Sequence, residues 1–563
     1  MPRALQVKNL SFQYRDSERK ALNSVSFQAK RGEFVAVMGP SGAGKSTLLL
    51  TLNGLIPHLI EGELEGEVVV DGWNTKEHQT RDFATRVGMV FQDFETQLFS
   101  TNVQLEVAFG PENLAIPPSE ILQRVQESLR SVGLEGFEGR EPATLSGGEK
   151  QRLAIASVLA MKPNLLCLDE PTSELDPAGR DDILAIARWV RESAFITLIM
   201  VEHSSEEVLG ADRIILLKGG KIVAMGPSST MLRDVNLLRK TGIRPIPIAE
   251  LFAAKGSKDP PLTLEEGLER FRKEGWAIDE LKYRSLTELQ GLRQRRYGRV
   301  LIDVRGLEHT YEGGIKALRG IDLQIREGEF VAIVGQNGSG KTTLVKHFNG
   351  LLHPTKGEVR IEGVEVREKD MLQLARRIGF VFQNPDHQIF AERVIDEISF
   401  GPRNFGFPEE AIAERAQRAL EAVNLLGSRD ADPFSLTKAE RQRLAVGSVL
   451  ASTTKVIVLD EPTTGMDYGE SIRMMDLIRE LNEKGHTIIM VTHTLWIVSQ
   501  YAHRVIVMRE GKIIRDGSTR EILSDPDGLR EASLKQPQMA AFGRELGDFV
   551  FLSPEECATC VVK

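Results

Sequence analysis

The stretches EFVAVMGPSGAGKSTLLL (residues 33–50) and EFVAIVGQNGSGKTTLVK (residues 329–346) each join an apolar segment, a glycine-rich loop and a second apolar run. This order indicates a strand, a loop and a helix, which is the context that a phosphate-binding loop requires. The glycines let backbone N–H groups curl around an anion at the helix N-terminus. We therefore predict that Lys45 and Lys341 reach the phosphates of a nucleotide.

The chain reads as a duplication of one domain. LCLDEPTSELD, downstream of the first loop, returns as IVLDEPTTGMD in the second half. Lys341 follows Lys45 by 296 positions, whereas Asp460 follows Asp169 by 291. One insertion explains this difference, because NGLIPHLIEGELEGEVVVDG after the first loop matches NGLLHPTKGEVRIEG, which is five residues shorter. Repetition over such a length predicts two copies of one folded unit.

The repeat predicts the organisation of the chain. We expect one domain at residues 1–228 and a second at 299–528, joined by a linker at 229–298 and followed by a tail at 529–563. The linker is rich in proline and charge, and we expect at least one short helix in it. Apolar runs that end in Asp-Glu indicate buried parallel strands, so the predicted fold class is α/β.

Composition excludes several classes of protein. A chain of 563 residues is too long for one core, and its net charge of −9 gives no general attraction to nucleic acid or anionic lipid. It has no run of 18 apolar residues, and its first residues lack a signal-peptide core, so any membrane role is expected to be peripheral. The three cysteines indicate a reducing compartment. We interpret Cys167 as a core residue and the Cys557–Cys560 pair as incidental, with a metal or redox role as the alternative.

Carboxylates follow the predicted strands of both copies. Asp169 and Asp460 each end an apolar run and are followed by Glu170 and Glu461. Side chains at strand ends of an α/β sheet lie at the ligand crevice. The aspartate suits a Mg²⁺ shell that the hydroxyl of the adjacent loop completes, and the glutamate suits polarisation of a water for attack on a γ-phosphate.

The segment LSGGE at residues 145–149, followed by KQR, resembles the signature of ABC ATPases, and both halves resemble that family over nearly their whole length. This resemblance implies two P-loop NTPase domains of ABC type, each with an antiparallel β subdomain and a helical signature subdomain. It also implies ATP and Mg²⁺ as cofactors, ATP hydrolysis, and intramolecular pairing of the two cassettes.

The resemblance assigns roles to matching positions. Tyr14 and Tyr311 are expected to stack on adenine, Asp176 and Asp467 to close the loop between opposed cassettes, and Glu170, Glu461, His203 and His493 to be catalytic. The expected Mg²⁺ ligands are Ser46, Gln92, Asp169, Thr342, Gln383 and Asp460. The expected nucleotide-binding residues are Tyr14, Gly39, Ser41, Gly42, Gly44, Lys45, Ser46, Thr47, Gln92, Ser146, Gly147, Gly148, Glu149, Tyr311, Gly335, Asn337, Gly338, Gly340, Lys341, Thr342, Thr343, Gln383 and Thr437.

The second copy departs from the signature. Where LSGGE is expected to recur, the sequence has LTKAE, so Lys438 and Ala439 replace both glycines. Glycine allows close approach of the backbone and φ values that lysine resists. In the family, each nucleotide lies between one copy's P-loop and the other copy's signature, so the two sites are expected to differ. We expect the Glu461 site, which would face the intact signature, to carry most turnover. The alternative is that the Lys438 ammonium rescues its own site.

A second shared stretch follows each glutamine. DFETQLFSTNVQLEVAFGPENL and NPDHQIFAERVIDEISFGPRNF resemble the docking region of energy-coupling factor (ECF) and cobalt-type uptake ATPases, although the first copy departs from NPDx with DFET. The resemblance implies an importer ATPase on the cytoplasmic face of the cell membrane. Its implied partners are an integral membrane coupling protein and a small membrane subunit that binds a vitamin or a transition-metal ion, with no nucleic acid.

A soluble tandem cassette that acts on the ribosome is the main alternative. It shares the two cassettes and the linker, and the basic residues at the linker end favour it, namely Arg293, Arg295, Arg296 and Arg299. The acidic net charge and the docking stretch argue against it. A DNA-repair or chromosome-organising ATPase is disfavoured, because neither a long coiled coil nor a zinc insertion interrupts the cassettes.

Overall fold

The structure is a computed structural model that describes residues 3–173, 175–193, 195–294, 297–368, 371–452 and 454–563. Arg295 and Arg296 of the basic cluster lie outside these residues. The chain divides into two compact units, the first of residues 1–249 with 467–469 and the second of the remaining residues. Within the described ranges, no helix has both the length and the hydropathy needed to cross a membrane.

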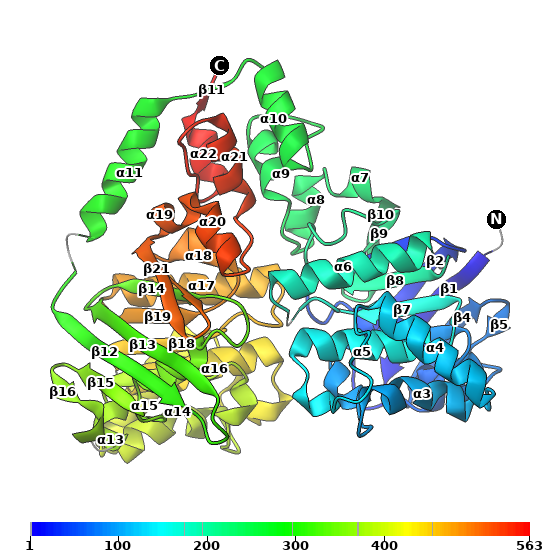
Figure 1. The fold of residues 1–563 in the computed structure, drawn as a ribbon, viewed down its shortest axis with the longest axis horizontal. Helices are drawn as coiled ribbons and strands as arrows, with labels where there is room; N and C mark the ends of the chain where they lie inside the picture. The colour runs from blue at the N-terminus through cyan, green and yellow to red at the C-terminus, as the bar shows by residue number, and fades with distance from the viewer. Residues whose placement is uncertain (1–2, 174, 194, 295–296, 369–370, 453) are drawn as a thin grey trace. The chain divides into compact units, whose positions relative to one another are not determined.

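Two sheets form the first copy, as Figure 1 shows in blue to cyan. The antiparallel sheet has the order β2-β1-β4-β5, with β1 (Arg3–Tyr14), β2 (Leu22–Lys30), β4 (Gly62–Val70) and β5 (Trp73–Asn74). The larger sheet has the order β10-β9-β3-β8-β7-β6, with β3 (Phe34–Met38), β6 (Val87–Val90), β7 (Leu165–Asp169), β8 (Thr197–Glu202), β9 (Arg213–Lys218) and β10 (Lys221–Pro227). Its strands are parallel except for the pair β9–β10.

The second copy repeats both strand orders. Its antiparallel sheet runs β13-β12-β15-β16, with β12 (Val300–Thr310), β13 (Lys316–Arg326), β15 (Lys356–Ile361) and β16 (Val364–Glu365). Its larger sheet runs β21-β20-β14-β19-β18-β17, with β14 (Phe330–Val334), β17 (Ile378–Val381), β18 (Val456–Asp460), β19 (Thr487–Val491), β20 (Arg504–Arg509) and β21 (Lys512–Ser518). Two α/β domains of one topology confirm the predicted fold class and the duplication.

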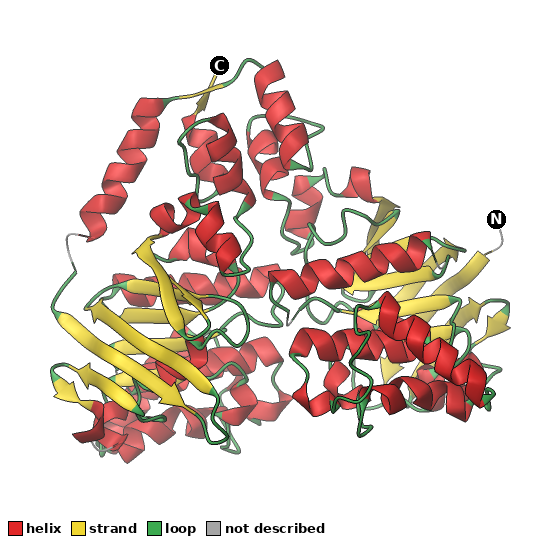
Figure 2. Ribbon diagram, viewed as in Figure 1, coloured by secondary structure: helices red, strands yellow, loops and turns green. Residues whose placement is uncertain are grey.

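Helices accompany the sheets of each copy (Figure 2). In the first copy they are α1 (Lys45–Leu52), α2 (Leu55–His58), η1 (Thr80–Phe83), η2 (Phe94–Gln97), α3 (Val103–Asn113), α4 (Pro118–Ser131), η3 (Pro142–Thr144), α5 (Gly147–Leu159), α6 (Pro177–Glu192), α7 (Ser228–Met231) and α8 (Val235–Lys240). In the second they are α12 (Lys341–Lys346), η4 (Val366–Glu368), α13 (Met371–Ala375), η5 (Pro385–His387), α14 (Val394–Asn404), α15 (Glu409–Ala422), η6 (Leu426–Ser428), η7 (Pro433–Ser435), α16 (Lys438–Ala451), α17 (Tyr468–Glu483), α18 (Leu495–Tyr501), α19 (Thr519–Ser524) and α20 (Pro526–Glu531).

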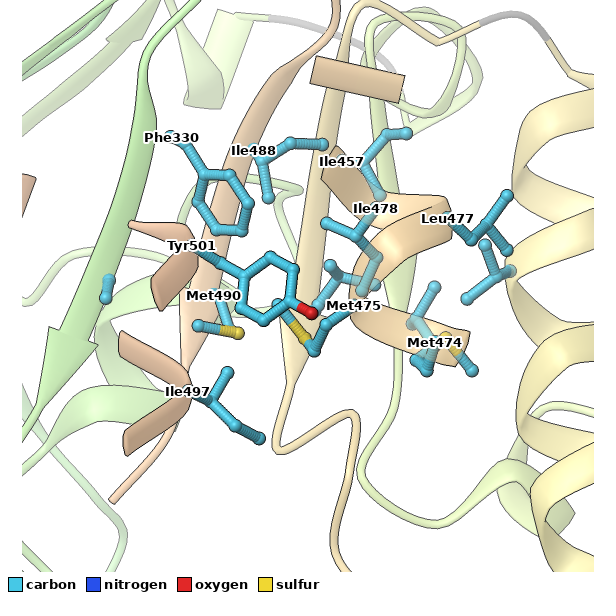
Figure 3. Packing of buried hydrophobic residues seen from close by; sticks show 14 of the residues in the cluster. Phe330, Ile457, Met474, Met475, Leu477, Ile478, Ile488, Met490, Ile497 and Tyr501 are labelled. Carbon is cyan, nitrogen blue, oxygen red and sulfur yellow. The ribbon is translucent and has the colours of Figure 1, made fainter. Parts of the chain in front are cut away.

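The central strands are apolar throughout because both of their faces are covered. Every residue of β3, β7, β14 and β18 is buried, which is typical of parallel strands between layers. Figure 3 shows this packing in the second copy, where Phe330 of β14 and Ile457 of β18 share one cluster with Met475 and Ile478 of α17. Cys167 lies buried in β7, as the sequence predicted.

The segments expected to be linker and tail form one folded extension of the second unit. Its elements are α9 (Pro247–Ala254), α10 (Leu264–Lys273), β11 (Ala277–Ile278), α11 (Glu280–Gln294), α21 (Gln538–Leu546), α22 (Pro554–Cys560) and β22 (Val561–Val562). Strand β11 pairs with β22 in an antiparallel ladder. The buried ring of Phe271 meets that of Phe542 edge to face, with centroids 5.7 Å apart, so helices from distant parts of the chain share one core.

The extension itself is duplicated. Thr263 caps α10 by accepting the N–H of Glu266, whose carboxylate accepts the N–H of Leu262 at 2.9 Å. Ser553 caps α22 in the same way, and the carboxylate of Glu556 accepts the N–H of Leu552 at 2.9 Å. Ser553 follows Thr263 by 290 positions, close to the separation of the two Asp-Glu pairs. The repeat therefore continues past both cassettes, and the Cys557–Cys560 pair is buried in the second copy of this extension.

We expect Phe542→Ala to loosen α10, because a buried phenylalanine contributes about 3–5 kcal/mol and this ring packs on Phe271. Hydrogen–deuterium exchange of residues 264–273 should accelerate, although they lie far from the substitution in sequence. Exchange in β3 and β7 should not change. The exposed Glu545→Ala, on the same helix as Phe542, is the control. Unchanged exchange of α10 in Phe542→Ala would contradict the shared core.

Candidate functional site

The P-loop of each copy has the geometry of an anion cradle. Gly42 and Gly44 have φ values of 71° and 96°, and Gly338 and Gly340 have values of 77° and 100°. A Cβ on Gly44 would stand 2.3 Å from the carbonyl oxygen of Ala21, so only glycine fits this position. Each loop joins a buried strand to a helix, β3 to α1 and β14 to α12. The loops carry the predicted positions Gly39, Ser41, Gly335 and Asn337, and the first turns of the helices carry Thr47 and Thr343.

The lysines of both loops fold back over their own backbone. Nζ of Lys45 donates to the carbonyls of Gly39 at 3.1 Å and Pro40 at 3.0 Å. Nζ of Lys341 donates to the corresponding carbonyls of Gly335 at 2.8 Å and Gln336 at 2.9 Å. Both side chains are buried, so each ammonium lies at the centre of its loop. Nζ of Lys45 also lies 3.8 Å from Oε1 of Glu170, and a phosphate would offer each ammonium a further charged partner in place of the neutral carbonyls.

Asp169 and Asp460 lie where the sequence predicted, at the buried ends of β7 and β18. Burial raises the pKa of each to about 6; the neighbouring Glu170 or Glu461 acts in the same direction, while a hydrogen bond from Ser46 or Thr342 opposes the rise. Thr342 donates to Asp460 at 3.1 Å. Oδ1 of Asp169 is buried without a hydrogen-bond partner. A carboxylate and a hydroxyl are oxygen donors that Mg²⁺ prefers, so the residues fit the predicted metal.

Glu170 and Glu461 are held in a strained backbone conformation. Their φ values are 50° and 49°, a left-handed region that residues other than glycine rarely adopt. Their peptide N–H groups donate to Val201 at 3.1 Å and to Val491 at 2.9 Å, which ties each glutamate to the neighbouring strand. Strain shared by both copies at matching positions indicates that the direction of these carboxylates is functional.

Each glutamate contacts its predicted histidine, but through different ring nitrogens. Nε2 of His203 lies 2.6 Å from Oε1 of Glu170, whereas Nδ1 of His493 lies 2.9 Å from Oε1 of Glu461. Burial would raise the pKa of Glu461, but the charge and hydrogen bond of His493, with help from Lys341, lower it. Glu461 is therefore ionised at neutral pH, as a group that orients water requires.

The predicted glutamines lie just after the edge strands β6 and β17. The amide of Gln92 donates to Oε2 of Glu170 at 2.9 Å, so the structure brings Gln92, Glu170 and His203 together. Gln383 occupies the matching position after β17, and both glutamines are exposed residues. The two copies thus place a glutamine alike, but their glutamates contact different ring nitrogens of the histidines.

The predicted adenine-stacking tyrosines are anchored to the P-loop helices. The hydroxyl of Tyr14 lies 3.0 Å from Oγ1 of Thr47, and that of Tyr311 lies 3.0 Å from Oγ1 of Thr343. A hollow of about 500 Å³ lies beside the first tyrosine, lined by Tyr14, Arg15, Asp16 and Glu61. The tyrosines therefore stand next to the cradles that their role requires.

The signature segments begin helices in both copies. Ser146 caps α5 and Thr437 caps α16, each in a reciprocal capping box with Glu149 or Glu440. One argument from the sequence is wrong here: Gly147 and Gly148 are helical and not left-handed, so backbone conformation does not require glycine. The two signatures therefore differ in side-chain bulk and charge. The space beside Gly147 is open, since nothing lies within 4 Å of a Cβ placed on this residue.

Lys438 lies against the loop that follows β18. A Cβ placed on Gly465 would stand 3.0 Å from the Lys438 ammonium, so the lysine extends over that glycine. Ala439 is buried behind it. The degenerate signature is therefore ordered by the same capping box as the intact one and presents a cation beside Gly465. The pairing of each signature with the other copy's P-loop stays a prediction.

Sequence reasoning missed a buried carboxyl pair in the first copy. Glu202 precedes His203, accepts a hydrogen bond from Thr172 at 2.9 Å, and is buried. Its pKa is raised well above the ordinary value by burial, and the neighbouring Glu207 raises it further. The signal was present as VEH in the first copy against VTH in the second. A buried carboxyl group beside the site is a further difference between the copies, because Thr492 occupies this position in the second copy.

Comparison with known proteins matches both site regions. The ABC transporter family model matches residues 22–173 and 318–464, each of which includes a P-loop and an Asp-Glu pair. A putative ABC transporter ATP-binding protein of Caldanaerobacter subterraneus subsp. tengcongensis is 50% identical over 558 residues, covering 98% of this chain and 98% of that protein. Another, from Methanosarcina mazei, is 40% identical over 560 residues, covering 96% and 93%.

A solved structure, CbiO1 of Clostridium perfringens, described as part of the ABC transporter complex CbiONQ, is 36% identical. It matches with a TM-score of 0.38 and covers 42% of this chain and 96% of its own.

We expect Asp169→Asn to stabilise the protein in the absence of nucleotide and Mg²⁺. The pKa of Asp169 is raised from 3.8 to about 6 in the folded state. Protonated Asp169 therefore stabilises the folded state fully below pH 3.8, and this stabilisation is lost as the pH rises through 6. The variant should exceed wild type by about 2–3 kcal/mol in free energy of unfolding at pH 8, with little difference at pH 4. Denaturant unfolding at pH 8, 6 and 4 measures this.

The control for that series is Asp181→Asn, which removes an exposed carboxylate on α6. It should change the free energy of unfolding little at any of the three pH values. Equal effects of the two substitutions would show that the burial of Asp169 does not set its pKa.

Proposed function

The chain belongs to the ABC transporter family as an ATP-binding protein with duplicated cassettes, and on this premise we propose that it is the ATPase of an ECF-type importer. It docks on the cytoplasmic face of the membrane against an integral coupling protein, and ATP hydrolysis drives uptake of a vitamin or a transition-metal ion. A small membrane subunit binds that substrate. The observation that carries the proposal is a pair of exposed aromatic side chains that recurs in both cassettes.

The aromatic pairs lie in the stretch after each predicted glutamine. Phe99 and Phe109 meet edge to face at 4.6 Å while 62% and 45% exposed. Phe390 and Phe400 repeat this arrangement at 4.6 Å, 59% and 44% exposed. Exposed apolar groups that form a patch mark interaction sites, whereas scattered ones do not. Two matching patches on one chain fit a partner that presents two apolar segments, as a membrane coupling protein does.

A buried glutamate holds each pair in place. The carboxylate of Glu106 in α3 accepts the backbone N–H groups of Phe99 at 3.0 Å and Ser100 at 2.8 Å. Glu397 in α14 accepts those of Phe390 at 3.1 Å and Ala391 at 3.0 Å. Both glutamates are buried, so each loop is fixed before any partner arrives. Preorganised loops lower the entropy cost of binding, which supports a docking role for them.

The glycine of the Phe-Gly-Pro sequence allows each of the two helices to pack closely against its neighbour. A Cβ on Gly110 would stand 2.8 Å from Met161, and one on Gly401 would stand 2.2 Å from Oγ of Ser452. Glycine therefore lets α3 and α14 approach the helices that begin at the signatures. A force on the aromatic pair reaches the signature helix through this tight contact. The same helix thus couples docking to the nucleotide chemistry.

The described side chains have separate tasks in hydrolysis. Lys45 and Lys341 exchange loop carbonyls for phosphate oxygens when nucleotide binds. Glu170 and Glu461 orient the attacking water, and His203 and His493 hold the two carboxylates. Asp169 with Ser46, and Asp460 with Thr342, would hold Mg²⁺, which would neutralise phosphate charge. In this proposal the free energy of ATP hydrolysis drives the reopening of the two cassettes.

The two sites have unequal roles in this proposal. The Glu461 site pairs with the intact Ser146–Gly148 signature, and the Glu170 site pairs with Thr437–Ala439. Lys438 places bulk and charge where the first copy has an open glycine. The charge of His493 lowers the pKa of Glu461 against the effect of burial, which suits a group that orients water. We therefore assign most of the turnover to the Glu461 site.

We expect Glu461→Gln to lower the ATPase rate at least tenfold more than Glu170→Gln. The reason is that the Glu461 site faces the intact signature and contributes most of the turnover. Steady-state phosphate release by the purified chain measures both rates. Glu170→Gln is itself the matched control, because it makes the same change in the other copy. Equal losses would refute the asymmetry, and a larger loss in Glu170→Gln would support rescue by Lys438.

We expect the combined Phe99→Ser and Phe390→Ser substitutions to release the chain from membranes, because both exposed patches lose an aromatic anchor. The tagged chain should no longer co-purify with a multi-span coupling protein from detergent-solubilised membranes of its host. Its ATP binding should be unchanged.

Phe195→Ser is the control, because Phe195 is 78% exposed but belongs to neither aromatic pair. It should leave co-purification intact. Recovery of wild type with ribosomal proteins from the soluble fraction would instead support the ribosomal alternative and contradict the importer proposal.

A further inference from the structure

Two histidines are buried behind the base-stacking tyrosine of the second cassette. His347 ends the P-loop helix and is fully buried, and His309 lies on β12 with 7% of its surface exposed. Their rings meet edge to face with centroids 4.8 Å apart. Neither residue belongs to the phosphate or metal sites described above, so their position needs a separate account.

The hydrogen bonds define the protonation of the pair. Nδ1 of His347 lies 2.7 Å from the carbonyl oxygen of Thr343, so this nitrogen carries a proton. Nδ1 of His309 lies 3.1 Å from the carbonyl oxygen of His353 and therefore also carries one. It lies 3.2 Å from Nε2 of His347, which accepts it. Nε2 of His347 can accept this bond only while the His347 imidazole is neutral.

The pair is connected to Tyr311 by two routes. The ring of His309 packs edge to face on the ring of Tyr311, with centroids 4.7 Å apart. The hydroxyl of Tyr311 bonds Oγ1 of Thr343, the residue whose carbonyl His347 binds. Tyr311, Thr343, His347 and His309 thus form a closed ring of contacts. Moving either imidazole moves the tyrosine.

The first cassette has the same tyrosine without the histidines. Phe12 packs edge to face on Tyr14 with centroids 4.9 Å apart, in the place of His309. Thr51 stands where His347 does, and its hydroxyl donates to Leu48 within its own helix at 2.7 Å. Tyr14 keeps the bond to Thr47. The chain therefore contains its own non-titrating version of the arrangement.

We propose that His309 and His347 are positioning residues for Tyr311, so that proton uptake by His347 weakens nucleotide binding at the second cassette and not at the first. The inference rests on the proposed function in one respect, the stacking of adenine on Tyr311. A protonated His347 can no longer accept the hydrogen bond from His309, because both of its nitrogens then carry protons. The closed ring of contacts opens at that bond.

The environment of His347 explains why this imidazole stays neutral near pH 7. Its pKa is lowered to about 4, chiefly by burial; the facing imidazoles of His309 and His353 act in the same direction, whereas the carbonyls of Thr343 and His353 oppose the change. An imidazole displaced from the pair regains its ordinary pKa near 6.5. Displacement therefore becomes up to about tenfold more favourable for each pH unit between 6.5 and 4. Acid acts on the second cassette through this equilibrium.

The test uses the full chain with one site disabled at a time. Lys45→Ala leaves nucleotide binding to the second cassette, and Lys341→Ala leaves it to the first. The dissociation constant of a non-hydrolysable ATP analogue with Mg²⁺ is measured for both by calorimetry at pH 8.0 and 5.0. The ratio of the second-site constant to the first-site constant should rise at least threefold at pH 5.0. Titration of the analogue itself cancels in this ratio.

The rescue variant carries His309→Phe and His347→Thr, which install the first cassette's own pair. In the Lys45→Ala chain it should keep the affinity at pH 8.0 and hold the ratio within twofold at pH 5.0. His347→Gln, which accepts a hydrogen bond without titrating in this range, should act in the same direction if the double variant folds poorly. A ratio that does not change with pH in the parent chains overturns the proposal, as does a pH effect that survives in these variants. No binding to Lys45→Ala at pH 8.0 would refute the second nucleotide site itself.

Discussion

The hydrogen bonding of parallel strands at the centre of each copy is the constraint on which the rest of the structure depends. In the first copy β3 pairs with β8 and β8 with β7, with Met38 opposite Glu202 and Asp169 opposite Val201. This register brings the P-loop, the Asp-Glu pair and the histidine to one edge of the sheet, although long segments of chain separate them. The strained φ of Glu170 and Glu461 is maintained because their N–H groups are tied to the neighbouring strand.

The two copies share one framework but differ in the side chains around their sites. Both copies keep the strand order, the folded-back lysine, the buried aspartate and the capped signature helix. The differences lie in side chains that touch these groups: Gln92 and Glu202 near one glutamate, Lys438 at one signature, and the histidine pair behind one tyrosine. Such substitutions alter charge and proton binding while the backbone geometry is preserved, so the two sites diverge without a change of fold.

The segments between and after the cassettes form a folded extension and not only a linker and a tail. Composition rich in proline and charge predicted a connecting linker, but helices α10 and α21 share an aromatic core and β11 pairs with β22. The matched caps at Thr263 and Ser553 show that these segments are repeats of each other. Their amphipathic helices cannot bury their apolar faces alone, so the two repeats cover one another.

The sequence by itself determined the features that depend on short-range interactions. The P-loops, the buried strands, the capped signature helices and the duplication were predictable because glycine spacing, apolar runs and cap residues act within a few positions. Tertiary structure alone decided the clamp of Glu106 and Glu397 on the aromatic loops, the pairing of the extensions and the contact between His309 and His347. It also corrected the reason for Gly147 and Gly148, which are helical. These features depend on which distant segments pack together. That packing is determined by the whole core, so it cannot be predicted from a local sequence pattern.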